Sequence, residues 1–423
     1  MKNRKDRQWS RLDNAAKIFP PSTNKRDTKV FRFACELNSP VDELLLQKAL
    51  RQTMEIFPGF RSVLKHGLFW YYLEASDIEP QVELEHTPPC SPIYDKNVKN
   101  LLFRVMHYKN RISVEVYHAL SDGTGVLQFL RVLVCSYLAL KHEGDLEGRR
   151  PMVDYDASTS QKMDDSFRRY YDNTKKQGKK KTVFAYKIKG PKLPENRIRV
   201  IEGLLPVPQV LAKARELGVT VTVLFTAVLM DAIYQEMAVR DRNKPIVVTI
   251  PVNLRKYFYS ESARNFFGIV DVGYVFGKNP GGFQDLLTEI GRQMKEKLKV
   301  EELEGRMNSL GSIERNVFAR ATPLVIKDFF MKIAYDLSAK QETATISNVG
   351  KIEMPEEFRE DIRLFDVFVS TNKLQICMCS FGENMTVSFT SPFSDTDVQR
   401  RFFRTLSGMG IPVEIVANQV DEE

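Results

Sequence analysis

One of the five histidines in this 423-residue chain, His118, stands in a context suited to acid–base chemistry. It closes a segment in which apolar and polar residues alternate, and Asp122 and Gly123 follow it closely. Imidazole titrates near neutral pH and is the side chain most often used for proton transfer. The remaining histidines lie beside turns, prolines or charged residues, where we expect surface or packing roles: His66, His86, His107 and His142.

The segment from His118 to Gly123 also fits a purely structural interpretation. It can be a strand-to-helix connection in which Asp122 or Ser121 caps the next helix and Gly123 permits a tight turn. His118 would then be incidental. The spacing alone does not decide between the two interpretations.

Further short motifs accompany the His-x-x-x-Asp-Gly segment along the chain. They are Phe57-Pro58-Gly59-Phe60-Arg61, Leu68-Phe69-Trp70, Pro251-Val252-Asn253-Leu254-Arg255, Asn265-Phe266-Phe267-Gly268 and Ser347-Asn348-Val349-Gly350. Together these motifs resemble the coenzyme A-dependent acyltransferase superfamily over roughly residues 28 to 408. That group includes chloramphenicol acetyltransferase, plant BAHD acyltransferases, condensation domains and microbial alcohol acetyltransferases, and the last branch is the most similar.

The resemblance implies a fold and a set of roles. The fold would be α/β (α+β), with two chloramphenicol-acetyltransferase-like lobes, each a mixed sheet with helices, and an active-site tunnel between them. His118 would be the general base, and Asp122 and Gly123 would shape its loop, with Asp122 paired to Arg255. Ser347 and Asn348 could contact the oxyanion or substrate, although a turn-forming role fits them as well.

Two departures from the family patterns narrow the implied activity. Tyr117 stands where condensation domains carry a second histidine, and the Asp-Phe-Gly-Trp-Gly block of the BAHD branch does not occur. We therefore expect a free-standing microbial enzyme that transfers an acyl group, acetyl by preference, from acyl-CoA to a small alcohol or amine. A condensation-type enzyme using a carrier-protein thioester, and a non-catalytic acyl-CoA-binding protein, remain as alternatives.

The charge balance bears on the partners. The net charge of +8 arises from 62 basic and 54 acidic residues, and part of it is a lysine run between residues 175 and 181. No aromatic-rich module accompanies that run, so we expect a solvated linker and no nucleic-acid partner. A mild positive excess also suits a phosphate-bearing ligand such as coenzyme A.

Composition and cysteine usage suggest a cytoplasmic globular protein. Hydrophobic residues make up 43% and charged residues 27% of the chain, no secretory h-region is recognisable, and charged residues interrupt or close the most apolar stretches before they reach the length of a membrane span. The five cysteines are scattered and without Cys-x-x-Cys spacing, so we expect reduced thiols, no metal site and no bound cofactor.

Periodicity predicts alternating strands and helices in both halves. Apolar spacing fades between residues 143 and 194, which places an N-terminal lobe at 1–165, a linker at 166–194 and a C-terminal lobe at 195–423. A helix is expected to start at Ser39 with Pro40 in its first position. Predicted strands in the first half are Val30–Leu37, Gly67–Leu73, Leu101–Tyr108 and Arg111–Tyr117.

Overall fold

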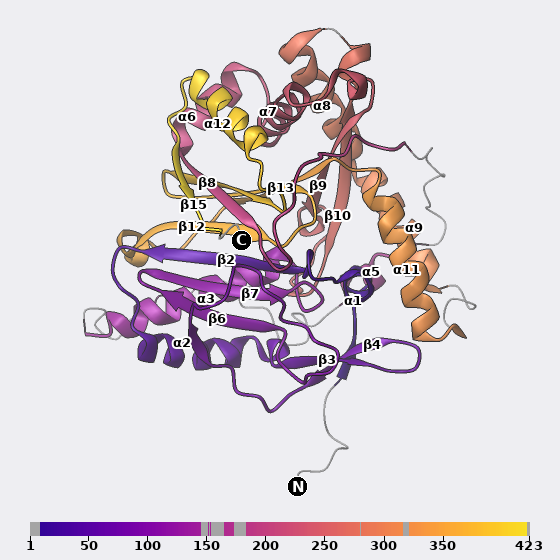
Figure 1. Cartoon of the computed structure of the whole chain (residues 1–423). Helices are drawn as coiled ribbons and strands as arrows, with labels where there is room; N and C mark the ends of the chain where they lie inside the picture. The colour runs from indigo at the N-terminus through magenta and orange to yellow at the C-terminus, as the bar shows by residue number, and fades with distance from the viewer. Residues whose placement is uncertain are drawn as a thin grey trace.

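Two β-sheets organise the chain, and each carries helices on its outer side (Figure 1). The computed structural model describes residues 9–144, 151, 153, 165–172, 183–279, 281–315 and 321–420. The two sheets lie between two helix layers, as the predicted two-lobed α/β architecture requires. Each lobe has its own cluster of buried apolar side chains.

The first lobe is built on a five-stranded sheet with the order β12-β2-β7-β6-β5. Its neighbours are antiparallel except for the parallel pair β5 and β6. Helices α2 (Glu43–Ile56) and α3 (Gly123–Lys141) pack against each other on its outer side. The strands are β2 (Val30–Leu37), β5 (Val82–Leu84), β6 (Phe103–Tyr108), β7 (Arg111–Tyr117) and β12 (Ile362–Val369).

The second lobe is built on a seven-stranded sheet with the order β10-β9-β11-β13-β14-β8-β15. β11 runs parallel to β9 and β13, and the remaining neighbours are antiparallel. The strands are β8 (Arg199–Pro206), β9 (Ile246–Asn253), β10 (Phe267–Tyr274), β11 (Ala344–Lys351), β13 (Leu374–Phe381), β14 (Asn384–Ser391) and β15 (Glu414–Ala417). The helices are α6 (Val207–Glu216), α7 (Val221–Gln235), α8 (Gly282–Lys297), α9 (Val300–Arg315) and α12 (Asp397–Gly408).

A small third sheet and several short elements lie at one end of the first lobe. The sheet has the order β1-β4-β3, with β1 (Trp9–Arg11), β3 (Ser62–His66) and β4 (Tyr71–Ala75). Helix α11 (Leu324–Ala339) packs near it on α1 (Phe19–Ser22), and α5 (Ser166–Arg169) contacts α9. α11 runs along the outer edge of the molecule (Figure 1).

The lobes are joined by a strand that crosses between them. β12 belongs to the second half of the chain but pairs with β2 over most of its length, with Phe365 opposite Cys35. It also packs on β13 and β14 of the other sheet. Part of the predicted linker, residues 173–182 with the lysine run, lies outside the described residues.

Local sequence signals account for most boundaries and fail at two places. Helix α2 begins at Glu43 rather than near Ser39, because the Asp42 carboxylate accepts a hydrogen bond from the Leu45 amide (2.9 Å) and so provides the cap. The strand predicted at Gly67–Leu73 is wrong in its first half. Gly67 lies in the turn between β3 and β4, where its amide donates to the Trp70 carbonyl (2.8 Å).

Helix α3 is long and apolar enough to cross a bilayer by composition, with a mean hydropathy of 1.5. Within the described chain, one other segment reaches that length, the pair α6 and α7, which is bent by 83°. α3 packs on α2, β2 and β7, and 56% of its apolar window is buried. It serves as a core helix of the first lobe, as its apolar spacing predicts.

Candidate active site

His118 lies in the short connection between β7 and α3, at the junction of the lobes. Its backbone amide donates to the Lys29 carbonyl (2.8 Å), which fixes the start of the connection. Its half-buried ring stacks on Phe19 with 4.3 Å between centroids. Phe31 of the first lobe and Phe267 of the second, at 4.8 and 5.6 Å, complete an aromatic enclosure.

Asn265 fixes the proton arrangement of the His118 ring. The Asn265 Oδ1 atom lies 3.1 Å from Nδ1 of His118, while its Nδ2 donates to the His118 carbonyl (3.2 Å) and to Asp13 Oδ2 (3.1 Å). Because Nδ2 has two acceptors, Oδ1 must accept, so Nδ1 of His118 carries the proton. The lone pair is then on Nε2, which has no hydrogen-bond partner among the described residues.

Asp13 holds Asn265 from the N-terminal segment. Its fully buried carboxylate accepts from the Asn265 amide nitrogen and side chain and from the Ala16 backbone (2.7 Å). Burial raises the pKa of Asp13, and nearby Arg264 and these hydrogen bonds oppose that shift. The sequence motifs gave no sign of Asp13, since it lies outside them all.

The His118 ring is biased toward its neutral form. Burial lowers the pKa of His118 below its usual 6.5, and this effect exceeds the opposing influences of its own backbone carbonyl, Asp122 and Asn265. A neutral imidazole with a free Nε2 can accept a proton at neutral pH. The arrangement therefore suits a general base.

Asp122 joins the two lobes through an ion pair with Arg255, as the resemblance implies. Arg255 Nη1 lies 2.8 Å from Asp122 Oδ2, and both side chains are largely buried, with 10% and 5% exposed. The same oxygen accepts from the Phe266 amide (2.8 Å), and Oδ1 caps α3 by accepting from Gly125 (3.0 Å). Asp122 is thus turned away from the His118 ring, and both oxygens of its carboxylate hold the loop and the lobes in position.

Arg255 is held in turn by backbone carbonyls of the second lobe. Its guanidinium donates to the carbonyl oxygens of Ser262 (2.7 Å), Arg264 (2.5 Å) and Phe266 (3.3 Å). Hydrogen bonds to several fixed acceptors compensate the desolvation of a buried charge. The pair therefore clamps the segment 262–266, which includes Asn265, against the His118 loop.

Gly125, and not Gly123, is the glycine that the close approach of the lobes requires. A Cβ on Gly125 would lie 2.1 Å from the Ala263 carbonyl oxygen and 2.3 Å from the Ser121 hydroxyl. At Gly123 the added atom would meet only Phe33, at 3.7 Å, and the residue has no positive φ. The prediction that Gly123 permits a tight turn is therefore corrected: the helix begins there in ordinary backbone geometry.

Ser347 and Asn348 lie on β11, where the strand bulges. The Asn348 Oδ1 atom accepts from the Gly350 amide (2.9 Å) and its Nδ2 donates to Thr222 (3.0 Å). The β11–β13 register shifts there, and Gly350 has φ +92°. Among the described residues, no hydrogen bond links either side chain to His118, so the geometry favours the turn-forming role.

Tyr117 occupies the position of the second histidine of condensation domains and points into the first lobe. It is fully buried, stacks on Tyr94 at 5.1 Å, and its hydroxyl lies 2.8 Å from the Thr23 hydroxyl. Burial raises its pKa well above the usual value, so the phenol stays neutral. Its role is packing.

Comparisons with known proteins define the fold. No family model and no curated sequence matches. The TRI3 trichothecene 15-O-acetyltransferase of Fusarium sporotrichioides is similar in structure, with TM-score 0.64, 10% identity, and 97% of this chain and 96% of that chain covered. F. graminearum TRI101 complexed with coenzyme A and deoxynivalenol also has TM-score 0.64 and 10% identity, over 96% and 99%.

A condensation domain shows the same architecture. The first condensation domain of the CDA synthetase matches with TM-score 0.59 and 14% identity, covering 96% of this chain and 97% of that chain. All three comparisons run over nearly the full length of both chains, so both lobes and their connection are shared. The chain therefore has the two-lobed fold seen in these acetyltransferase and condensation-domain structures.

Proposed function

We propose that this chain is an acyl-CoA-dependent acyltransferase that moves an acyl group, acetyl as the first candidate, from the thioester to an alcohol hydroxyl. The observation that carries the proposal is the His118 ring, with its Nδ1 proton held by Asn265 and its Nε2 lone pair free. The fold supports it, since similar structures include an O-acetyltransferase and a protein complexed with coenzyme A.

The chemistry would proceed in two proton transfers at Nε2 of His118. The ring accepts the hydroxyl proton as the acceptor oxygen attacks the thioester carbonyl, which forms the new C–O bond and a tetrahedral oxyanion. Collapse of the oxyanion breaks the C–S bond, and the imidazolium returns its proton to the leaving thiolate. Asn265 keeps the ring in the required tautomer, while Asp122 and Arg255 hold the loop.

The test is release of free coenzyme A thiol and mass-spectrometric detection of acylated product, with acyl-CoA donors screened against alcohols and amines. We expect turnover with at least one pair, lowered about 10²–10⁴-fold in His118→Ala. His86→Ala, at an exposed histidine whose ring contacts the Leu84 carbonyl (2.9 Å), is the matched control and should leave the rate unchanged. Full activity in His118→Ala would exclude the proposed base.

The second candidate keeps the base and changes the donor to a carrier-protein thioester. The structural similarity to a condensation domain favours it, whereas the buried Tyr117 in place of the second histidine speaks for the first candidate. The two are separated by the donor requirement: turnover with acyl-CoA alone supports the first, and strict dependence on an acylated carrier supports the second. Binding of acyl-CoA without any turnover, unchanged in His118→Ala, would indicate the non-catalytic alternative.

A further inference from the structure

Helix α11 exposes most of its large apolar side chains to solvent, together with Lys332 and Asp336, and turns several polar side chains toward the protein. The residues facing inward are Leu324, Lys327, Asp328, Met331 and Tyr335, and of these only Leu324 is buried, with 8% of its surface exposed. The outward side, here called the apolar outer face, is between 41% and 81% exposed at each residue. It consists of Val325, Ile326, Phe329, Phe330, Ile333 and Leu337.

This orientation is fixed by polar contacts on the inner side. The Tyr335 hydroxyl accepts from Lys29 (2.6 Å) and donates to Asp27 (3.2 Å), and Asp328 accepts from the Tyr71 hydroxyl (2.6 Å). Rotating the helix to bury its phenylalanines would break these bonds. A surface helix of a globular domain normally turns its apolar stripe to the core, so the reversed arrangement marks a contact surface.

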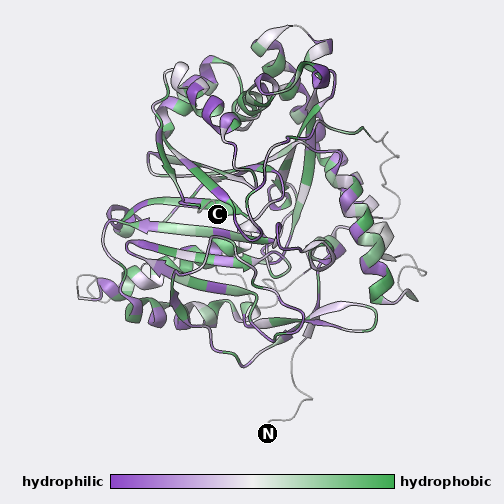
Figure 2. Cartoon of the chain, viewed as in Figure 1, coloured by the Kyte–Doolittle hydropathy of each residue, from purple (hydrophilic) through white to green (hydrophobic). Residues whose placement is uncertain are grey.

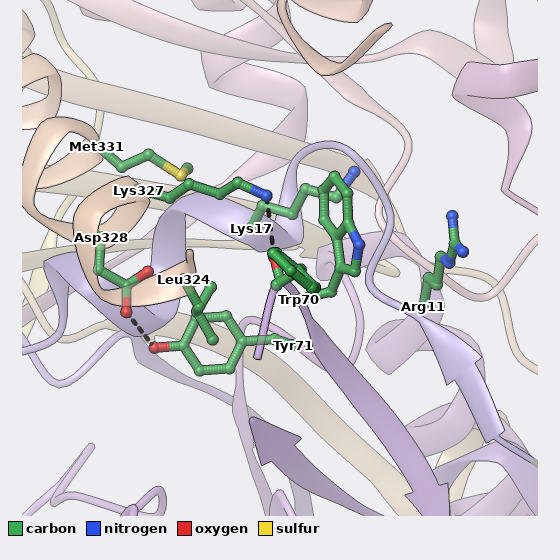
Figure 3. Close-up of a pocket in the computed structure, with 9 residues that line it drawn as sticks. Arg11, Lys17, Trp70, Tyr71, Leu324, Lys327, Asp328 and Met331 are labelled. Atoms are coloured by element: carbon green, nitrogen blue, oxygen red, sulfur yellow. Dashed lines mark hydrogen bonds between the residues drawn. The ribbon is translucent and has the colours of Figure 1, made fainter. Parts of the chain in front are cut away.

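Cations and aromatic rings gather at the N-terminal end of the helix. Arg11, Lys17 and Lys327 surround the Trp70 ring, with Lys327 Nζ at 3.7 Å and the other two cations at 5.8 Å from its centroid (Figure 3). Asp328, the one acid lining this small pocket, is engaged by Tyr71. Burial and nearby Lys17 lower the pKa of Lys327, so an anion placed here would be stabilised.

Both tryptophans of the chain lie at this end of the molecule. Trp9 is 62% exposed on β1, which pairs with β4, and Trp70 immediately precedes β4. The Leu68 carbonyl accepts from the Leu324 amide (2.8 Å), so the exposed side chains of Leu68 and Phe69 lie beside the start of α11. Tryptophan favours the boundary between headgroups and acyl chains of a bilayer.

We infer that the apolar outer face of α11 docks on an anionic lipid membrane, with the phenylalanines in the acyl boundary and the cations of the Trp70 pocket at the headgroup phosphates. Figure 2 shows green, apolar segments alternating with purple, polar ones along this helix at the outer edge of the molecule. Charge complementarity favours an anionic surface, since basic groups outnumber acidic ones around the pocket. No described residue packs over the face.

A second copy of the chain fits this face less well. The helix has 16 residues, so the face is about 24 Å long and about 10 Å wide, a footprint on the order of 250 Å². A stable protein interface buries about 800 Å² per partner. A bilayer needs no matched shape and accepts a single helix lying in its surface.

The experiment is flotation of the full chain with vesicles of phosphatidylcholine alone or with about 30% phosphatidylserine. We expect binding to the anionic vesicles only, reduced at least tenfold in a Phe329→Glu, Phe330→Glu variant. The matched control is Leu44→Glu with Val239→Glu, at residues 76% and 77% exposed elsewhere on the surface, and it should bind like the parent chain.

A second measurement uses the parent chain without substitution. Tryptophan fluorescence should shift to shorter wavelength when anionic vesicles are added, because Trp9 and Trp70 flank the docked face. No flotation, flotation unaffected by the two glutamates, or a concentration-dependent dimer abolished by them would overturn the proposal. No readout depends on turnover, so this inference and the proposed acyl transfer fail independently.

Discussion

At the residue scale, the decisive contact is the one between Asn265 and the His118 ring. An amide side chain can accept or donate, and here the two acceptors of its nitrogen, the His118 carbonyl and Asp13, leave only its oxygen for Nδ1. In the proposed reaction Asn265 would therefore be a positioning residue rather than a catalytic one. The neutral imidazole should be the Nδ1–H tautomer, which ¹⁵N NMR of the histidines can observe directly.

Substituting Asn265 by Ala should lower the rate without weakening donor binding. We expect kcat to fall roughly 10–100-fold with KM for acyl-CoA nearly unchanged, since the lost contact orients the base and does not hold the donor. The ¹⁵N signals of His118 should show a mixture of tautomers. Asn279→Ala, at an exposed asparagine of the second lobe, serves as the control, and an unaltered His118 spectrum in Asn265→Ala would disprove the positioning role.

The aromatic enclosure of the half-buried His118 ring also predicts the pH dependence of the reaction. Its pKa is lowered by burial, and the proposed base works only when neutral, so kcat/KM should rise with pH along an acidic limb to a plateau. The midpoint of the acidic limb should lie below 6.5, the usual histidine value. Initial rates across a buffer series measure it, and a midpoint above 6.5 would contradict the assignment of the base.

At the element scale, the approach of α3 to the segment 262–266 depends on Gly125. An alanine there would place its Cβ against the Ala263 carbonyl and the Ser121 hydroxyl, and both atoms are fixed by their mutual hydrogen bond (2.5 Å). We expect Gly125→Ala to reduce the free energy of unfolding by about 1–3 kcal/mol and to lower activity, because the lobes must move apart.

The matched substitution is Gly291→Ala in α8. That glycine has no atom within 4 Å of an added Cβ, so alanine should be neutral or stabilise the helix by about 0.5–1 kcal/mol. Urea denaturation of both variants measures the difference. Equal stability of the two would mean that the lobe contact at Gly125 does not constrain folding.

Elements with a clear period or cap were predictable from the sequence. The strand β2 and the buried face of α2 follow directly from apolar spacing. The alternation of apolar and polar residues in β7 wrongly predicts an exposed polar side, because Ser113 and Glu115 are also fully buried. Glu115 pairs there with Arg32 (2.7 Å) and Arg104. Apolar spacing did not reveal α11, and the reversed orientation of its faces depends on contacts with distant segments.

The candidate site was predictable where motifs carry it. His118, Asp122 and Arg255 came from the motifs, and the structure brings Asp122 and Arg255 together. The link from Asp13 through Asn265 to His118 could not be predicted, because it joins three segments that are distant in sequence. No local preference encodes such a contact, which arises only when the lobes pack.

At the scale of the whole molecule, the two sheets meet through buried charges. The guanidinium of Arg111 in β7 lies 3.2 Å from Asp366 of β12 and 3.9 Å from Glu202 of β8. The Arg111 side chain therefore bridges both sheets. Glu36 and the Ser388 hydroxyl also face this cluster. Arg363 also contacts Glu36, but the carboxylates in this largely buried cluster still outnumber the cations, which favours protonation of a carboxyl group.

Stability should therefore decline as pH rises toward neutrality. Burial, and then the neighbouring Asp366, raise the pKa of Glu202 to about 7, against 4.5 ordinarily. The folded state thus binds this proton more tightly than the unfolded state, so the stabilisation is complete below pH 4.5 and is lost as pH rises through about 7.

Glu202→Gln keeps a neutral side chain at every pH and should remove this part of the decline, on the order of 1–3 kcal/mol. Urea denaturation from about pH 5 to about pH 8 measures it, with the exposed Glu296→Gln as the control. The outcome that would contradict this is a stability difference between Glu202→Gln and the parent chain that does not change with pH. It would show that Glu202 is ionised throughout this range and that Arg111 compensates its negative charge.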